Sequence, residues 1–380
     1  MANPKHRILI PKKAGQRRLL ALTGGGIRGI LTLGILEKIE ADLKAKLKAG
    51  AGFRLNQYFD FIGGTSTGAI IAAGLSKGLS VQELVDFYVE TGPQMFEKER
   101  LRKRFWQKFK SDPLKKKLQE VLGPSTTLGS DRLKTLLLLV LRNVTTDSPW
   151  PLTNNPLAKY NDATRQDSNL NLPLWQLVRG STAAPTYFPP ETVNVGPSEF
   201  VFVDGGVTPY NDPAFLMYRI ATASPFNLEW EAEEDTMMIV SVGTGTTPVA
   251  GPDALDPQRS LLSIAQAIAP ELMSGMAYDQ DINCRTVGRC TFGAELDREV
   301  GTMVPSVPLT EPLGRHFLYA RYDPDITQEG LTALGLPKIS SERVSQLDAV
   351  DAIDDLLQIG RVYAQSNVDL SKHFGPTFLQ

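Results

Sequence analysis

Two glycine-rich corners, each preceded by an apolar run and followed by a helix-like segment, constrain the fold of this chain most strongly. The first, "TGGGIRG", follows Leu19 to Leu22 and leads into "ILTLGILEKIEADLKAKLK". The second, "GGTSTG", follows "YFDFI" and leads into "AIIAAGLSKG". A strand, a tight turn and a helix, repeated in this order, are typical of an α/β fold with a largely parallel sheet. We therefore expect a mostly parallel central sheet with helices on both faces.

Further segments extend this pattern. "SVQELVDFYVE" begins with Ser80 and Glu83 at the spacing of a capping box, which predicts a helix start. "EFVFVDGG" and "TMMIVSVGTG" are typical of strands that end in glycine turns. The run "LLLLVL" at 136–141 is far shorter than the roughly 20 residues of a membrane-spanning helix, and we expect it to form a buried helix.

Composition changes along the chain suggest its organisation. From about residue 92 to 172 the sequence is rich in basic and loop-forming residues, which predicts an inserted cap region. We expect an N-terminal extension at 1–16, a core at 17–250 that contains this insertion, and a C-terminal part at 251–380 that packs on the core. "SERVSQLDAVDAIDDLLQIGRVYAQS" has apolar residues at helical spacing, so we expect the C-terminal part to end in a helix.

Overall composition excludes several classes of protein. The 380 residues are 42% hydrophobic and 22% charged, with a net charge of -2, which gives no sign of nucleic-acid binding. Cys284 and Cys290 are too few for a disulfide framework and lack the company of a zinc site. The first apolar run ends at Pro11, so no signal peptide is expected. We expect a cytoplasmic protein, and export without a cleavable signal stays open.

The second corner has the form of a nucleophile elbow. Gly64-Thr65-Ser66-Thr67-Gly68 fits G-x-S-x-G, in which a serine occupies a strained turn between a strand and a helix. The amino end of the following helix would then favour negative charge at the serine. An ordinary turn between strand and helix has the same pattern and remains the alternative.

The first corner can bind an anion through its backbone. The N–H groups of Gly24, Gly25 and Gly26 can converge on one atom because no Cβ obstructs their approach. Such a loop can be an oxyanion hole for acyl transfer or, because Gly24, Gly26 and Gly29 satisfy G-x-G-x-x-G, a dinucleotide site. The next segment, "EKIEADLKAKLKAGAG", lacks the second strand that a dinucleotide site requires, which favours the oxyanion hole.

A serine nucleophile also needs a base. The three histidines, His6, His316 and His373, all lie outside the glycine-rich motifs. Asp204 directly follows an apolar strand and precedes two glycines, and the carboxyl ends of strands are where α/β sheets place functional groups. Asp-Gly is also a common turn signal, so a structural role is the alternative. Ser66, Asp204 and His316 also occur in the order of an α/β-hydrolase triad, which we keep as a second enzymatic hypothesis.

Four blocks in this order resemble the patatin-like phospholipases: "GGGIRG", "GTSTG", "STAAPTYFPP", and "DGG" followed by "NDP". The resemblance runs from about Arg18 to Pro213 and continues through "SVGTG". It implies a three-layer α/β fold and a lipid acyl hydrolase of the phospholipase A or lysophospholipase type. Such an enzyme cleaves fatty-acyl esters through a Ser–Asp dyad and an acyl-enzyme, without a catalytic histidine, a metal or a cofactor.

The resemblance also implies roles for individual residues. By position, Ser66 is the nucleophile, Asp204 is the base, and the backbone N–H groups of Gly24–Gly26 hold the oxyanion. Arg28 matches a basic position of the same loop, where it either orients the loop or meets a phosphate head group. Thr23 is a departure, since many members carry Asp before the glycines, and this puts the tuning of the loop in doubt.

The expected partners are a phospholipid or lysophospholipid substrate and, transiently, a membrane surface. The basic and aromatic segment "EKERLRKRFWQKFKSDPLKKK", residues 97–117, could lie in a membrane interface or form a solvated helix that packs on the core. Some members of the family are effectors in bacterial antiviral signalling activated by a small nucleotide, although no motif here identifies such a site. A non-catalytic lipid- or nucleotide-binding relative is the remaining alternative.

Overall fold

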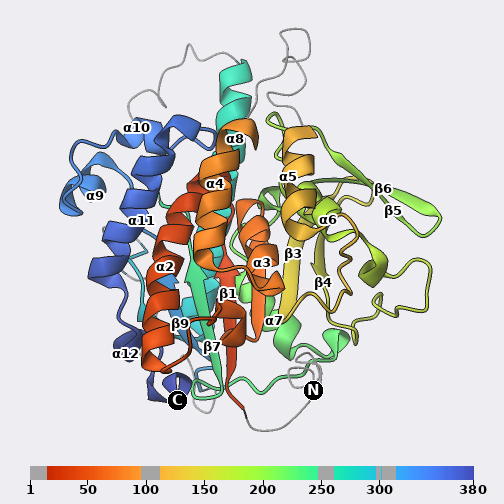
Figure 1. Cartoon of the computed structure of the whole chain (residues 1–380), viewed down its shortest axis with the longest axis horizontal. Helices are drawn as coiled ribbons and strands as arrows, with labels where there is room; N and C mark the ends of the chain where they lie inside the picture. The colour runs from red at the N-terminus through yellow and green to blue at the C-terminus, as the bar shows by residue number, and fades with distance from the viewer. Residues whose placement is uncertain (1–14, 96–111, 247–260, 297–300, 302–313) are drawn as a thin grey trace.

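Within the residues that the structure describes, namely 15–95, 112–246, 261–296, 301 and 314–380, the central element is a nine-stranded sheet. Figure 1 shows this sheet in a computed structural model of the chain. The strands follow the order β5-β6-β3-β2-β1-β7-β9-β8, with β4 paired to β3. Their bounds are β1 (Arg17–Leu22), β2 (Phe61–Thr65), β3 (Leu136–Asn143), β4 (Ser148–Thr153), β5 (Glu191–Val195), β6 (Ser198–Asp204), β7 (Met237–Val242), β8 (Arg289–Phe292) and β9 (Leu318–Tyr322).

Most strand pairs are parallel, and the central strands of the sheet are buried on both faces. The pairs β1–β2, β1–β7, β2–β3, β7–β9 and β8–β9 are parallel, whereas β3–β4, β3–β6 and β5–β6 are antiparallel. Leu20 and Leu22 of β1 belong to one buried hydrophobic cluster, and Leu19 and Ala21 belong to the other. A sheet buried on both faces reads as continuous apolar runs, as these strands do. The predicted α/β fold with a mostly parallel sheet between helices is confirmed.

Helices form the two outer layers (Figure 1). One face packs against α7 (Ala214–Thr222) and the carboxyl half of α8 (Leu261–Val287). The other face packs against α2 (Gly29–Lys46), α3 (Thr67–Lys77), α4 (Val81–Met95), α5 (Asp112–Leu122), α6 (Leu174–Ser181) and α11 (Ile353–Asn367). The predicted capping box starts α4, because the Ser80 N–H donates to Glu83 Oε2 at 2.8 Å and the Glu83 N–H donates to Ser80 Oγ at 3.2 Å. None of the described helices has the length and hydropathy to cross a bilayer.

The prediction of a buried helix at 136–141 is wrong, because these residues lie in β3, an interior strand of the sheet. A short continuous apolar run is compatible with a buried strand as well as a buried helix, and periodicity alone does not separate the two. Residues 136–153, which the composition placed in an inserted cap, therefore belong to the sheet as β3 and β4. Most of the basic and aromatic segment, residues 97–111, lies outside the described residues.

The C-terminal part contributes both to the sheet and to a helical layer. β9 pairs with β7, so the sheet crosses the boundary that the sequence placed at residue 250. The predicted late helix is α11, which packs on α2. The two helices approach closely at glycines, since a Cβ on Gly360 would lie 2.2 Å from the carbonyl oxygen of Leu31. Two short turns follow, α12 (Leu370–His373) and η8 (Pro376–Leu379).

Candidate active site

Ser66 occupies the corner between β2 and α3 in a conformation typical of a nucleophile elbow. Its φ of 56° and ψ of -124° lie where few residues other than glycine are found. The flanking glycines make the corner possible. A Cβ on Gly64 would lie 2.0 Å from the carbonyl oxygen of Gly68, and a Cβ on Gly68 would lie 2.2 Å from that of Leu22. The corner thus holds the serine at the amino end of α3, as the motif predicts.

The strand that carries Asp204 runs in a direction that the sequence argument did not predict. β6 is antiparallel to β3, so Asp204 does not lie at the carboxyl edge of a parallel strand. β2 pairs with residues 136–140 of β3, β6 pairs with residues 141–143, and β4 pairs with residues 138–143. Because β4 occupies the other side of β3, β2 and β6 lie end to end on the same side. Their carboxyl ends face each other, and Ser66 and Asp204 meet in the gap.

The two side chains are in direct contact. Ser66 Oγ donates a hydrogen bond to Asp204 Oδ2 at 2.6 Å, and the Gly206 N–H donates to Asp204 Oδ1 at 2.7 Å. Asp204 is 1% exposed, and this burial raises its pKa to about 6. The hydrogen bonds from Ser66 and Gly206 and the positive charge of Arg179 act in the opposite direction. The carboxylate is therefore more basic than an ordinary aspartate and still largely ionised at neutral pH.

Hydrogen bonds to the block "STAAPTYFPP" hold the backbones of Ser66 and Asp204. The backbone N–H of Ser66 donates to Ser181 Oγ at 3.0 Å, and Ser181 Oγ donates to the carbonyl oxygen of Val140 at 2.7 Å. The Asp204 N–H donates to the carbonyl oxygen of Ala183 at 3.0 Å. One short segment thus holds the backbone of both residues. Sequence reasoning did not assign this role to Ser181, whose only signal was its place in the block.

The glycine loop borders the serine, but its three N–H groups are not equivalent. A Cβ on Gly24 would lie 3.1 Å from the Cβ of Ser66, so the loop is adjacent to this serine. The Gly24 N–H donates to the carbonyl oxygen of Asn211 at 3.1 Å and is not available to a ligand. In the described part of the chain we find no acceptor for the N–H groups of Gly25 and Gly26. Gly26, whose φ is 60°, lines the pocket beside Ser66.

Arg28 contacts the backbone of the turn after β7 and is not among the residues that line the pocket beside Ser66. It is 7% exposed, and its Nη1 donates to the carbonyl oxygen of Gly245 at 3.4 Å. Burial lowers the pKa of Arg28, while the charge of Asp323 opposes this. Its two expected roles, orienting the glycine loop and meeting a phosphate head group, stay predictions.

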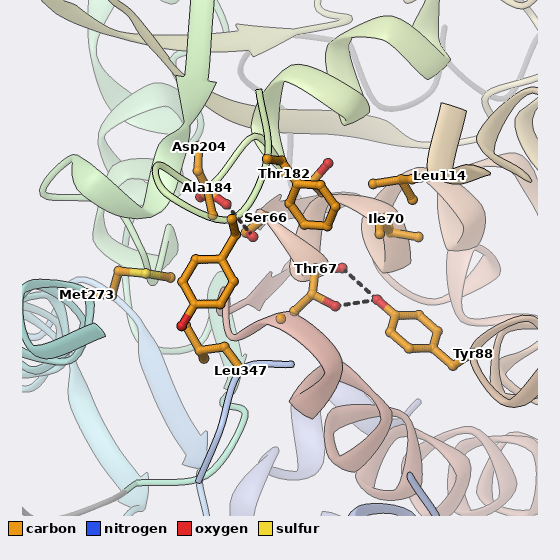
Figure 2. A pocket seen from close by; sticks show the side chains of 13 residues that line it. Ser66, Thr67, Ile70, Tyr88, Leu114, Thr182, Ala184, Asp204, Met273 and Leu347 are labelled. Carbon is orange, nitrogen blue, oxygen red and sulfur yellow. Dashed lines mark hydrogen bonds between the residues drawn. The ribbon is translucent and has the colours of Figure 1, made fainter. Parts of the chain in front are cut away.

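A largely apolar pocket opens onto Ser66 and Asp204. Its cavity volume is about 50 Å³, which has room for several water-sized groups. Figure 2 shows Ile70 and Leu114 on one side of Ser66 and Met273 and Leu347 on the other. Thr67 and Tyr88, whose side-chain oxygens are hydrogen-bonded to each other, contribute polar groups to the same wall (Figure 2). The pocket thus combines the polar Ser66–Asp204 pair with walls that are mostly apolar.

Both described histidines lie away from this pair. His316 precedes the amino end of β9, the opposite edge of the sheet from the serine, and its Nδ1 contacts the hydroxyl of Tyr218 at 2.5 Å. His373 Nδ1 contacts the hydroxyl of Tyr322 at 2.9 Å. β9 is three strands from β2, which corresponds to roughly 14 Å. The order Ser, Asp, His in the sequence therefore does not correspond to a triad in space, and His6 lies outside the described residues.

The cysteines and the acidic residues form no metal site in the described ranges. Cys284 is a buried free thiol and Cys290 is an exposed one. Among the residues whose positions are given, no group of three or more His, Cys, Asp or Glu side chains could hold a metal ion.

Comparisons with known proteins agree with these features. The family model of the patatin-like phospholipases matches residues 20–218, a little more than half of the chain. Patatin-16 of Solanum tuberosum and patatin-17 of Solanum cardiophyllum are each 33% identical to it over 250 residues. That alignment covers 60% of this chain and 60% of each patatin, so the chain spans about three fifths of the relatives it matches. The crystal structure of VipD from Legionella pneumophila aligns at 13% identity and a TM-score of 0.36, covering 91% of this chain and 67% of VipD. This chain belongs to the patatin-like phospholipase family.

Proposed function

We propose that this protein is a lipid acyl hydrolase of the phospholipase A or lysophospholipase type, with Ser66 as nucleophile and Asp204 as general base. The observation that carries the proposal is the 2.6 Å hydrogen bond from Ser66 Oγ to a buried carboxylate. A nucleophile and a base within hydrogen-bond reach, beside a pocket and on a strained corner, are the arrangement that acyl transfer requires. Membership of the family supports the choice of a lipid ester as substrate.

In the first half of the reaction, Asp204 accepts the proton of Ser66 as Oγ attacks the ester carbonyl carbon. The resulting tetrahedral intermediate collapses when Asp204 returns that proton to the leaving alcohol oxygen, which leaves an acyl-enzyme on Ser66. In the second half, a water molecule gives a proton to Asp204 and attacks the acyl carbon, and the fatty acid departs as Ser66 regains its proton. A pKa of about 6 suits Asp204 to both directions of transfer better than the ordinary value near 3.9.

We assign the oxyanion site to the N–H groups of Gly25 and Gly26 and to the amino end of α3. The Gly24 N–H, which the resemblance included, is already bonded to Asn211. Fixed donors of this kind stabilise the negative charge that develops on the carbonyl oxygen in the transition state. The position of Arg28 against Gly245 supports a role in holding this region of backbone and not one at a phosphate head group.

The walls of the pocket support a long acyl chain as the group that is transferred. Ile70, Leu114 and Phe188 form an apolar surface next to the serine. Burial of methylene groups against them would supply roughly 0.8 kcal/mol each.

Labelling with a fluorophosphonate tests the proposed function. The wild-type protein should react at Ser66 and hydrolyse both a short-chain ester and phospholipid vesicles, whereas Ser66→Ala should do neither. The exposed Ser224→Ala is the matched control and should behave as wild type. His316→Ala should retain activity, because His316 lies at the far edge of the sheet. Loss of activity in His316→Ala with an intact fold would favour a triad, and a wild-type protein without label or hydrolysis would favour a binding protein.

A further inference from the structure

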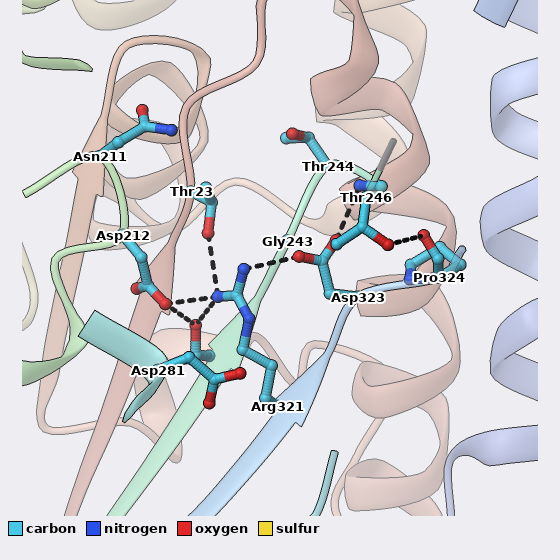
Figure 3. Close-up of polar contacts among 12 residues, drawn as sticks. Thr23, Asn211, Asp212, Gly243, Thr244, Thr246, Asp281, Arg321, Asp323 and Pro324 are labelled. Atoms are coloured by element: carbon cyan, nitrogen blue, oxygen red, sulfur yellow. Dashed lines mark hydrogen bonds and ion pairs between the residues drawn. The ribbon is translucent and has the colours of Figure 1, made fainter. Parts of the chain in front are cut away.

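Arg321, on β9, is a buried arginine of the C-terminal part and lies outside the segment that matches the family model. Its side chain is 6% exposed, and its guanidinium contacts residues from four separate segments (Figure 3). Nη1 donates to Thr23 Oγ1 at 3.2 Å, to Ser241 Oγ at 2.5 Å and to Asp212 Oδ2. Nη2 donates to Asp323 Oδ2 at 2.6 Å. Arg321 is therefore the centre of a polar network beneath the candidate active site.

Two members of this network adjoin the glycine loop directly. Thr23 immediately precedes Gly24. Asp212 immediately follows Asn211, whose carbonyl oxygen accepts the hydrogen bond of the Gly24 N–H. The same guanidinium thus binds Thr23, which precedes the loop, and Asp212, which follows the residue that accepts the Gly24 hydrogen bond. The position of Gly24 relative to the segment at Asn211 depends on both contacts.

A third member acts on the carbonyl side of the same glycine. Asp323 Oδ1 accepts the Gly245 N–H at 2.8 Å, which holds the turn after β7. In that turn, Thr244 Oγ1 donates to the carbonyl oxygen of Gly24 at 3.2 Å. The Gly24 carbonyl and the Gly25 N–H belong to one trans peptide and point in opposite directions. Fixing the carbonyl therefore fixes the direction of the Gly25 N–H, one of the two proposed oxyanion donors.

Charge and geometry both favour an arginine at this position. Asp212 is fully buried and Asp323 is nearly so, and both carboxylates face the one guanidinium. The planar fork of arginine can donate to several acceptors at fixed angles, whereas the ammonium of lysine is a single point charge on a flexible stem. A lysine at 321 would retain a positive charge but could not bridge Thr23, Asp212 and Asp323 together.

From these contacts we infer that Arg321 is a positioning residue for the proposed oxyanion loop, acting through Thr23 on one side and through Asp323 and Thr244 on the other. This inference rests on the proposed function, since it concerns the same site. It makes the C-terminal part of the chain a contributor to catalysis and not only to packing.

Thr23→Val is the variant that tests the inference most directly. Valine keeps the shape of threonine and removes the oxygen that accepts from Arg321, while the ion pairs with Asp212 and Asp323 remain. Thr23→Ser is the matched control, because it keeps that oxygen. Removing the charge of Arg321 would leave two buried carboxylates unpaired and would endanger folding. Arg321→Lys is therefore used as the second variant.

The readout is kcat and KM for a soluble short-chain ester, with kcat expressed per site labelled to completion by a fluorophosphonate. Thr23→Val and Arg321→Lys should lower kcat per site by about tenfold or more, since loss of an aligned oxyanion donor costs on the order of 100- to 1,000-fold. KM should change by less than about twofold, and Thr23→Ser should match wild type. Variants that merely fold less well would lose labelled sites and keep kcat per site.

Two outcomes would overturn the inference, and they are distinguishable. A normal kcat per site in folded Thr23→Val shows that the network does not align the loop, while the proposed function stands. If Arg321→Lys fails to fold, the kcat per site of Thr23→Val still tests the inference. A wild-type protein that is neither labelled nor active overturns the proposed function itself, and the positioning role falls with it.

Discussion

Replacing Asp204 by asparagine should make the folded protein more stable at neutral and alkaline pH while it removes hydrolysis. Asp204 is 1% exposed, and burial raises its pKa from 3.8 to about 6. Asparagine has nearly the same shape and carries no charge. Its oxygen can still accept from the Gly206 N–H, and its amide can donate to Ser66 Oγ. The substitution therefore removes the cost of a buried charge without opening a cavity.

The magnitude and the pH range follow from the difference in pKa between the two states. At about pH 3 and below, the carboxyl group is protonated in both the folded and the unfolded chain, so it has almost no effect on the free energy of unfolding. As the pH rises from 3.8 to about 6, the unfolded chain loses this proton first, and the folded state becomes less stable. Above pH 6 the full cost is reached. A difference of about 2.2 pKa units corresponds to about 3 kcal/mol, which Asp204→Asn should recover as an upper value.

Denaturant unfolding of both proteins at a series of pH values measures this directly. The stability difference should be no more than about 0.6 kcal/mol at about pH 4 and should rise to between 1 and about 3 kcal/mol at about pH 8. Asp235→Asn, at an exposed carboxylate, is the control and should change stability by no more than about 0.5 kcal/mol at either pH. If Asp204→Asn were less stable than wild type at pH 8, or equally stabilised at both pH values, the reasoning about a costly buried base would be refuted.

Three further predictions concern activity. Hydrolysis should decline as the pH falls through about 6, and Arg179→Gln should move this decline to higher pH because the Arg179 charge favours the ionised form of Asp204; a pH–rate profile that does not move would contradict this. Gly25→Val should lower kcat by about 100-fold or more with little change in KM. A Cβ at this position would lie 2.2 Å from Thr244 Oγ1, so the substitution would displace a proposed oxyanion donor. Normal turnover would exclude this loop as the oxyanion site. Lys115 and Lys116 are exposed on α5, next to Leu114, which lines the pocket. Replacing both by Gln should reduce hydrolysis of anionic vesicles, because about 1 kcal/mol of attraction is lost per charge, and should leave hydrolysis of a soluble ester unaffected. Unchanged vesicle activity at low salt would contradict docking through α5.

The parts of the fold and site that could be predicted are those with a local signal. The two corners combine an apolar strand, glycines and a helix within about twenty residues, so β1, α2, β2 and α3 follow from periodicity and turn chemistry. Ser66 stands on such a corner and Asp204 ends such a strand, which is why both could be proposed and why the structure brings them together. Their catalytic roles remain a prediction until the variants are measured.

What could not be predicted depends on contacts between distant segments. The run at 136–141 has no period that separates strand from helix, and only its three strand partners make it β3. The direction of β6 is likewise invisible in its own residues, so the sequence argument for Asp204 is incomplete. Ser181 and Arg321 act on residues 115 and 298 positions away, and neither stands in a pattern that distinguishes it from other serines and arginines.

Because β2 and β6 lie end to end along β3, one peptide bond of β3 sets the distance between their carboxyl ends. Thr65 is level with Val140, and Asp204 is level with Leu141. The separation of Ser66 and Asp204, the proposed nucleophile and base, thus depends on the bond between two apolar residues of β3. The side chains of β3 can be exchanged for others of similar volume, whereas one residue inserted between Val140 and Leu141 would move the two groups apart by about 3.3 Å. A design that transfers this site to another scaffold therefore has to keep the length and register of β3, whereas the side chains of β3 can vary.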